Sequence, residues 1–340
     1  MGCKIIELLE SKQIEIEDLA GKKLAVDSHN LLYQFITTIR QRDGSPLTDS
    51  QGRITSHLQG LFARTTKLMK ANLKLAFVFD GKPPELKEAE IEKRRKIKIE
   101  AQKLFQKAVE SKNVEEMQKY GGRFSYLTKE MIEESKELIN ALGNPVIQAP
   151  SEGEAQASYM VKQDDCYAVV SQDADSLLFG AKRAIRNLSI EGRRKVPRTL
   201  TYIKVNPEII DLEENLKKLN LTQDELIILG ILSGTDFNPG GIKGIGPKKG
   251  LKLIQENKND FEKIFDSVEW TFPYSWKTVF DTFKKMPIEK DYDLKWKDVD
   301  HNKVIEILCE EHNFDRQRIE NSLQDLTKKP KSQKGLGEWF

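Results

Sequence analysis

Short apolar runs alternate with longer amphipathic stretches along the first half of the chain. Four of these runs are mainly apolar, as strands of a parallel sheet are when both faces are buried, and they span residues 23–26, 75–79, 145–147 and 167–170. The stretches 55–70 and 128–142 have the spacing of helices. Strands that alternate with helices predict an α/β fold with a mainly parallel central sheet flanked by helices.

Each predicted strand is followed by one or two acidic residues. These are Asp27, Asp80, the pair Glu152 and Glu154, and the pair Asp173 and Asp175. The carboxyl ends of parallel strands meet at one edge of the sheet, where ligands of such folds bind. We therefore expect these six carboxylates to lie at a common rim. A seventh acid, Asp236, follows the helix-like run 225–232, and its spacing alone does not place it with the others.

Local structure offers another explanation for each acid. Ser151 and Glu154 have the spacing of a capping box. Asp27 and Asp175 fit helix caps, and Asp80 fits a turn. The seventh acid fits an ordinary turn. A shared site is favoured because caps and turns do not require acids to follow four strands at the same rim.

A site built from several carboxylates needs compensating positive charge. Two like charges about 4 Å apart repel by about 4 kcal/mol at an effective dielectric constant of about 20, so the acids would be protonated or bound to cations. The four histidines and three cysteines are scattered and lack the spacing of a zinc site. Oxygen ligands alone favour Mg²⁺ or Mn²⁺. Two such ions suit in-line displacement at phosphorus, so the acids predict phosphodiester hydrolysis.

Composition indicates the class of protein and its compartment. The chain has 340 residues, of which 38% are hydrophobic, enough for a sizeable core in one or two domains. Its formal net charge of +2 favours no particular partner. Cys3, Cys166 and Cys309 lie far apart, as in a reducing compartment without disulfides. No apolar run reaches the ~20 residues of a membrane span and no secretory signal opens the chain, so we expect a soluble intracellular protein without a membrane partner.

Three basic segments predict contact with nucleic acid. Segment 87–107 holds eight basic and four acidic residues shortly after Asp80. A solvated charged helix would have the same composition, but its position favours a gate that binds the phosphate backbone. Segment 241–249 combines a glycine turn with a helix that begins at proline, which presents backbone N–H groups to phosphate, unless it is only a structural turn. Segment 192–198 is a basic loop or a solvated hairpin.

Six motifs along the chain are similar to those of a known family. In order, they are VDSHNLLYQF, VFDGKPPELK, PSEGEAQA, SQDADSLLFG, SGTDF and GIKGIGPKK. They resemble the motifs of the flap endonucleases, the archaeal and eukaryotic branch of the structure-specific 5′ nucleases, and the resemblance runs from residue 1 to about residue 265. It implies an enzyme that cuts branched DNA at the base of a 5′ flap, one nucleotide inside the duplex, in lagging-strand maturation and repair.

The resemblance implies roles for individual residues. The two Mg²⁺ or Mn²⁺ ions would be held by Asp27, Asp80, Glu152, Glu154, Asp173, Asp175 and Asp236. Lys87 and Arg94 would reach the scissile phosphate as electrostatic catalysts. The residues implied to contact DNA are Gly2, Tyr33, Arg64, Gly234, Gly244, Gly246, Lys248 and Lys249, and a base would stack on Tyr33. His29 and Asn30 lie where the family varies, and we assign no role to them.

The resemblance also implies three larger features. Segment 82–130 would form a helical arch over the active site, through which a 5′ single strand threads. Segment 53–64 would accept a one-nucleotide 3′ flap. Segment 241–249 would belong to a helix–two-turn–helix element that grips the duplex and holds a monovalent cation, usually K⁺.

The end of the chain predicts a partner protein. Residues 328–331 have the composition of a linker, and the two aromatic residues that end the chain need an apolar surface to cover them. Gln333, Leu336, Trp339 and Phe340 resemble the motif that binds a sliding clamp, with docking on the protein's own core as the alternative. We expect a monomer with a nuclease domain at 1–325, in parts of about 1–105, 115–265 and 266–325, and a flexible tail at 326–340.

Three other functions share parts of this pattern. Excision-repair endonucleases of the superfamily carry a long insertion, whereas only 71 residues separate Asp80 from Glu152. 5′→3′ exonucleases share the acids, but the tail favours a flap endonuclease. A non-catalytic DNA-binding scaffold need not keep all seven acids together with Lys87 and Arg94. We therefore interpret the chain as a flap endonuclease, in the cytoplasm of an archaeon or the nucleus of a eukaryote.

Overall fold

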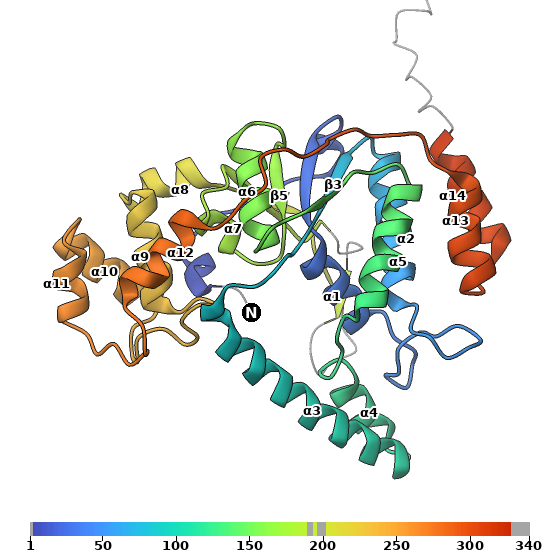
Figure 1. Ribbon diagram of the computed structural model, residues 1–340, viewed down its shortest axis with the longest axis horizontal. Helices are drawn as coiled ribbons and strands as arrows, with labels where there is room; N and C mark the ends of the chain where they lie inside the picture. Colours follow the sequence, from blue (N-terminus) through green and yellow to red (C-terminus); the bar gives the residue numbers. More distant parts are fainter. Residues whose placement is uncertain (1–2, 189–192, 196–201, 328–340) are drawn as a thin grey trace, which may run out of the picture.

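A seven-stranded sheet forms the centre of the molecule (Figure 1). The computed structural model describes residues 3–188, 193–195 and 202–327. Five parallel strands, in the order β6-β5-β2-β3-β4, make up most of the sheet, and β9 and β1 extend the β6 edge in antiparallel pairing. The strands are β1 Lys12–Gln13, β2 Lys23–Asp27, β3 Lys74–Phe79, β4 Val146–Gln148, β5 Ala168–Val170, β6 Arg183–Arg186 and β9 Glu208–Asp211, with β7 Arg193–Lys195 and β8 Tyr202–Lys204 in a separate two-stranded sheet.

Helices cover both faces of the sheet, which confirms the predicted α/β fold. Successive strand residues point to opposite faces, so Leu24 and Val26 of β2 pack on one side and Ala25 on the other. The first face is covered by α1 Ser28–Thr38, α2 Ser56–Lys70 and α5 Lys129–Ala141, and the second by α6 Gly153–Lys162. A third apolar cluster involves α7 Asp175–Leu178, α8 Leu212–Leu219 and α9 Gln223–Ser233.

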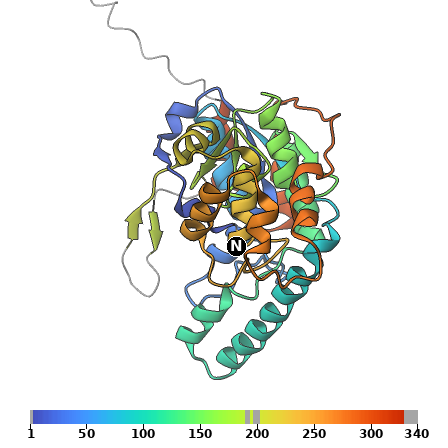
Figure 2. The same cartoon turned by 90° about the vertical axis from the view of Figure 1, so that its left-hand side faces the viewer.

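The long basic segment after β3 forms two helices that extend away from the body. These are α3 Glu88–Glu110, preceded by the short 3₁₀ helix η3 Glu85–Lys87, and α4 Val114–Gly121, and both views show them projecting from the rest of the protein (Figures 1 and 2). Within the described part of the chain, every exposed large apolar side chain lies on these two helices or, for Tyr126, shortly after them: Ile91, Ile97, Ile99, Leu104, Val109, Val114 and Tyr126. The segment is helical, as expected for residues 82–130, and its role as an arch stays a prediction.

The glycine motif connects two packed helices. α10 Pro247–Asn257 begins with proline at its first turn, as predicted, and Gly246 is its N-cap. Gly234 ends α9 at φ +101°, and a Cβ atom there would lie 2.7 Å from the backbone nitrogen of Gly241. Only glycine fits this close approach of two backbone segments. Two further helices follow, α11 Phe261–Asp266 and α12 Trp276–Lys285.

An extended strap at 287–300 carries the chain back across the sheet to the opposite end of the molecule (Figure 1). Tyr292, Leu294 and Trp296 pack at alternate positions on the α6 side, and the Trp296 indole N–H donates to the Leu75 carbonyl at 2.9 Å. The strap leads to α13 His301–Ile305, a π-helical turn at Glu306–Glu311 and α14 Arg316–Thr327. α14 thus extends two residues into the range predicted for the tail.

No helix in the described ranges is long and apolar enough to span a membrane. The predicted clamp-binding residues, Gln333, Leu336, Trp339 and Phe340, lie outside the described residues, as does Gly2.

Candidate active site at the carboxyl rim of the sheet

The seven predicted acids come from five places in the chain that the fold brings together. Asp27 ends β2 and Asp80 follows β3. Glu152 and Glu154 lie at the start of α6, Asp173 and Asp175 lie between β5 and the first turn of α7, and Asp236 follows α9. Asp27 interacts electrostatically with Asp80 and Asp173. Asp175 interacts with Asp173 and Asp236, so the acid that spacing could not place belongs to the same cluster.

Burial makes ionisation of this cluster costly. Removal from water, and then the neighbouring carboxylates, raise the pKa of Asp27, Glu154 and Asp175 above the ordinary range. Ionisation of all three side chains at neutral pH is therefore disfavoured unless cations compensate their charge. The donors are all carboxylate oxygens, which fits Mg²⁺ or Mn²⁺ better than zinc.

Two basic side chains already contact the acids. Lys87 Nζ lies 2.6 Å from Glu152 Oε2 and 3.3 Å from Asp236 Oδ2. The Arg94 guanidinium lies 2.6 Å from Asp236 Oδ1. Burial alone would lower the pKa of Lys87, but the charges of Glu152 and Asp236 raise it, so the ammonium stays charged. Within the described ranges, no three acid, histidine or cysteine side chains are gathered closely enough to form a ready-made coordination sphere.

Polar neighbours that the sequence did not single out also contact the acids. The Asn30 side-chain N–H donates to Asp173 Oδ2 at 3.0 Å. Ser171 Oγ lies 3.1 Å from Glu154 Oε1 and 3.3 Å from Asp27 Oδ2. The backbone N–H of Asp80 donates to His29 Nδ1 at 3.1 Å. His29 and Asn30, to which we assigned no role, thus both contact residues of the acid cluster. The sequence shows that these polar residues lie close to acids along the chain. It does not show which distant acids they contact in the folded protein.

Backbone amides hold two further carboxylates. The N–H of Cys3 donates to Asp175 Oδ1 at 2.9 Å, which brings the start of the described chain to the cluster. The N–H of Gly153 donates to Asp80 Oδ1 at 2.7 Å. Both bonds hold an acid through a backbone N–H group, and a Cβ atom at Gly153 would lie only 2.7 Å from Asp80 Oδ1.

The local explanations for the acids are true for some positions and wrong for others. Asp27 does cap α1, because it accepts a hydrogen bond from the Asn30 backbone N–H at 3.1 Å. The capping box is wrong: Glu152 is the N-cap of α6 and makes no side-chain cap, and Ser151 Oγ donates to the Lys82 carbonyl instead. A helix cap and a place in the acid cluster are therefore compatible for the same residue.

The residues implied to contact DNA lie in different environments. Tyr33 is partly buried on α1, with Lys98 Nζ 4.6 Å from its ring centroid. Arg64 is only 3% exposed, so a DNA contact would require this side chain to leave the interior. The turn residues are better placed, because four of them are exposed: Gly244, Gly246, Lys248 and Lys249. Of the basic segment 192–198, only residues 193–195 are described, as β7.

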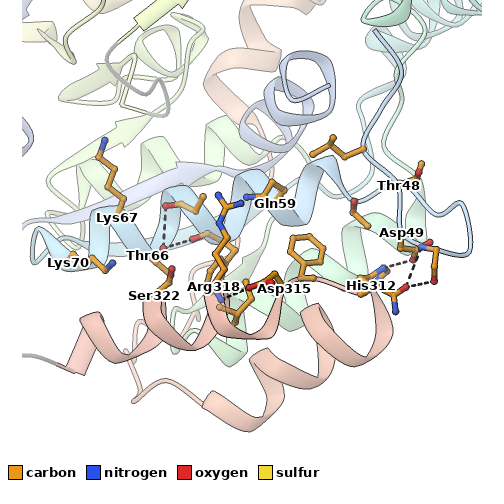
Figure 3. A pocket seen from close by; sticks show the side chains of 18 residues that line it. Thr48, Asp49, Gln59, Thr66, Lys67, Lys70, His312, Asp315, Arg318 and Ser322 are labelled. Carbon is orange, nitrogen blue, oxygen red and sulfur yellow. Dashed lines mark hydrogen bonds and ion pairs between the residues drawn. The ribbon is translucent and has the colours of Figure 1, made fainter. Parts of the chain in front are cut away.

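A cavity of about 480 Å³ lies away from the acids, between α2, the loop before it and α14 (Figure 3). One wall comes from residues 47–70 and overlaps the segment implied to accept a 3′ nucleotide. The other wall comes from residues 312–322, which the sequence did not connect with this function. Its polar lining includes Thr48, Gln59, Lys67, Arg318 and Ser322.

A buried ionic network ties the two walls of this cavity together. His312 Nδ1 lies 3.1 Å from Asp49 Oδ2 and its Nε2 3.4 Å from Glu134 Oε1, and His57 Nε2 lies 3.2 Å from Glu134 Oε2. Burial opposes ionisation of Glu134, but hydrogen bonds from His312 and His57 outweigh it and lower its pKa to about 2. The hydrogen bond with Glu134 raises the pKa of His312, although burial opposes this.

Stability should therefore depend on pH through His312. Its pKa is higher in the folded than in the unfolded protein, so its stabilising effect is complete below about pH 6.5 and is lost as pH rises through the folded pKa. We expect the difference in melting temperature between wild type and His312→Asn to be larger at pH 6 than at pH 9, by calorimetry. Comparing the two proteins removes the contribution of the acid cluster, and an equal difference at both pH values would contradict the assignment.

Comparisons with known proteins agree with this arrangement. The XPG N-terminal domain family matches residues 2–101 and the XPG I-region matches residues 143–236. Flap endonuclease 1 of Thermococcus onnurineus is 49% identical over 342 residues, which cover 100% of this chain and 99% of that protein, and the Pyrococcus horikoshii protein is 48% identical.

Solved structures give the same result. Flap endonuclease-1 from Methanococcus jannaschii superposes with a TM-score of 0.76 at 39% identity, covering 96% of this chain and 98% of the other. The catalytic core of Rad2 in complex with a DNA substrate has a TM-score of 0.70 at 23% identity, which shows the shared fold. Because relatives at this identity match its full length and its fold, the chain belongs to the flap endonuclease family and is a nuclease that cuts 5′ flaps.

Proposed function

We propose that this nuclease hydrolyses the phosphodiester at the base of a 5′ DNA flap with two divalent metal ions. The supporting observation is the gathering of seven acids from five segments at one rim, beside Lys87 and Arg94. The ions would be held by Asp27, Asp80, Glu152, Glu154, Asp173, Asp175 and Asp236. Bound Mg²⁺ or Mn²⁺ would activate water and neutralise charge on the phosphate.

The two cations of the site have a separate role in this proposal. Lys87 ends η3 and Arg94 lies in the second turn of α3, so both stand where the arch segment leaves the rim. Both are held as ion pairs by carboxylates that divalent ions would neutralise. Once these carboxylates are neutralised, the basic side chains are free to contact the scissile phosphate and stabilise the charge that develops on it.

The rest of the DNA would be held at three other places. The exposed Gly244–Gly246 turn and the N-terminus of α10 present backbone N–H groups, with Lys248 and Lys249, to the duplex, and a K⁺ ion would sit at this turn. The 480 Å³ cavity would take the single 3′ nucleotide, since its lining combines polar, basic and apolar groups. The exposed apolar and basic side chains of α3 would line the path of the 5′ strand.

A labelled double-flap DNA tests the proposed function. We expect one cut at the base of the 5′ flap in Mg²⁺, no cut in EDTA, and much slower cutting when a bulky group blocks the 5′ end. A cut in EDTA would overturn the metal-dependent mechanism. Equal rates with free and blocked ends would show that the strand does not thread through the arch, and removal of single nucleotides from recessed ends alone would indicate an exonuclease.

We further propose that the tail recruits the enzyme to a sliding clamp during lagging-strand maturation and repair. Removing residues 333–340, or changing Trp339 and Phe340 to alanine, should abolish clamp binding and clamp stimulation, because short motifs depend on a few buried anchors worth about 2 kcal/mol or more each. Cleavage without clamp should stay near the wild-type rate, since all seven acids precede residue 240. Titration with clamp and a flap assay measure the two effects.

The competing explanation for the tail predicts a different result. If Trp339 and Phe340 covered the protein's own core, truncation would lower the melting temperature even with no clamp present. A large drop in melting temperature together with unchanged clamp affinity would contradict recruitment through the tail.

A further inference from the structure

Ser171 stands at the junction of three of the seven acids. It follows β5 directly and is only 3% exposed. Its hydroxyl lies within hydrogen-bond distance of Glu154 Oε1 and Asp27 Oδ2, and it accepts a hydrogen bond from the backbone N–H of Asp173 at 3.2 Å. A hydroxyl has one hydrogen to donate, so the Ser171 hydroxyl shares that hydrogen between the carboxylates of Glu154 and Asp27. Its oxygen also accepts from the backbone N–H of Asp173.

Asn30 makes a second connection to the same acids. Its side-chain N–H donates to Asp173 Oδ2, and its side-chain carbonyl accepts from the backbone N–H of Gln172 at 3.3 Å. Its own backbone N–H donates to Asp27 Oδ1. One residue of α1 therefore fixes both the carboxylate of Asp173 and the loop that carries it, and joins them to the end of β2.

We propose that Ser171 and Asn30 are positioning residues that set the metal affinity of the acid cluster. This inference rests on the proposed two-metal function and goes beyond it, because it assigns a role to two residues that carry no charge. Ser171 holds one oxygen of Glu154 and one of Asp27, and the Asn30 side chain holds one oxygen of Asp173, so these contacts would fix the orientation of carboxylates that bind a divalent ion. Outer contacts of this kind fix the orientation of metal ligands in proteins.

Ser171 and Asn30 are uncharged, unlike Lys87 and Arg94, which also contact the acids. Lys87 and Arg94 neutralise Glu152 and Asp236, and their positive charge competes with a metal for the same oxygens. Ser171 and Asn30 donate hydrogen bonds without net charge, so they stay in contact with Asp27, Glu154 and Asp173 when the cation binds. We infer that this neutral pair keeps the carboxylates in place in both the metal-free and the metal-bound protein.

Direct metal binding tests the inference without relying on activity. In a titration of the metal-free protein with Mn²⁺, followed by electron paramagnetic resonance and without DNA, Ser171→Ala and Asn30→Ala should each weaken binding by about tenfold or more. Ser171→Thr keeps the hydroxyl and should retain most of the affinity. Thr38→Ala serves as the matched control, since it removes a side-chain hydrogen bond from the same helix, α1, away from the acids.

Two further measurements separate positioning from a general structural role. The Mg²⁺ concentration for half-maximal single-turnover cleavage should rise in both alanine variants, while affinity for flap DNA in EDTA should match wild type. Unchanged Mn²⁺ affinity in both variants would overturn the inference, as would a parallel loss of DNA affinity and melting temperature. If Ser171→Ala does not fold, the Mn²⁺ affinity of Asn30→Ala tests the inference. Asn30 is partly exposed, so its replacement should disturb folding less.

The same experiment distinguishes this inference from the proposed function. A wild-type protein that binds Mn²⁺ but does not cut the double flap would refute the proposed function. The comparison of Mn²⁺ affinity between wild type and the two alanine variants would still be valid. A wild-type protein that cuts in Mg²⁺, with variants of equal metal affinity, would refute only the positioning role.

Discussion

Replacing Asp175 with asparagine is expected to lower the single-turnover rate of flap cleavage by about 10³-fold or more, with flap DNA binding nearly unchanged. Asp175 is buried, begins α7 and lies among Asp173, Asp236 and Glu154. Asparagine has nearly the same shape and can still accept the hydrogen bond from the Cys3 N–H, so the fold should persist. The variant loses the negative charge that binds the cation, and Asp173→Asn should behave in the same way.

Rapid-quench kinetics on a labelled double flap, with enzyme in excess, measures this rate. Fluorescence anisotropy in Ca²⁺ measures DNA binding separately, because the predicted DNA-contacting turn lies just before α10 rather than at the acids. Glu213→Gln is a matched control, since it also replaces a carboxylate by an amide, but on the exposed surface of α8. Turnover near the wild-type rate in both aspartate variants would contradict the metal-ligand assignment.

Alanine at Lys87 or Arg94 should lower the single-turnover rate by about 10²–10³-fold, far more than it weakens DNA binding. Each side chain is charged and contacts the acids through short ion pairs, at 2.6 Å for Lys87 with Glu152 and for Arg94 with Asp236. Charge that develops on the phosphate in the transition state would be stabilised by these groups, whereas the ground-state DNA is held at several other places.

Lys295→Ala is the control for this pair of variants, because it removes an exposed lysine from the strap that pairs with Asp293, away from the acids. Rates at saturating enzyme and dissociation constants in Ca²⁺ separate chemistry from binding. Loss of affinity with an unchanged rate at saturation would mean that Lys87 and Arg94 are ordinary backbone contacts.

Local patterns were sufficient for the central part of the fold. The predicted strands 23–26, 75–79, 145–147 and 167–170 agree with β2, β3, β4 and β5 to within one residue at each end, because buried parallel strands are short apolar runs. β6 and β9 were missed, since each holds only two apolar residues between charged ones. Their pairing with neighbouring strands, and not their own composition, makes them strands.

The sequence by itself determined six of the acids as a group, because acids at the ends of parallel strands share one edge whatever the loops do. It also determined the proline start of α10, which depends only on the geometry of one residue. The tertiary structure alone decided that Asp236 joins the acids, that Lys87 and Arg94 contact them, and that Ser171 and Asn30 support them. It also decided that residues 312–322 close a cavity on α2. These contacts join residues from 17 to more than 250 positions apart, and such pairings follow from how helices and strap pack on the sheet, which no local pattern encodes.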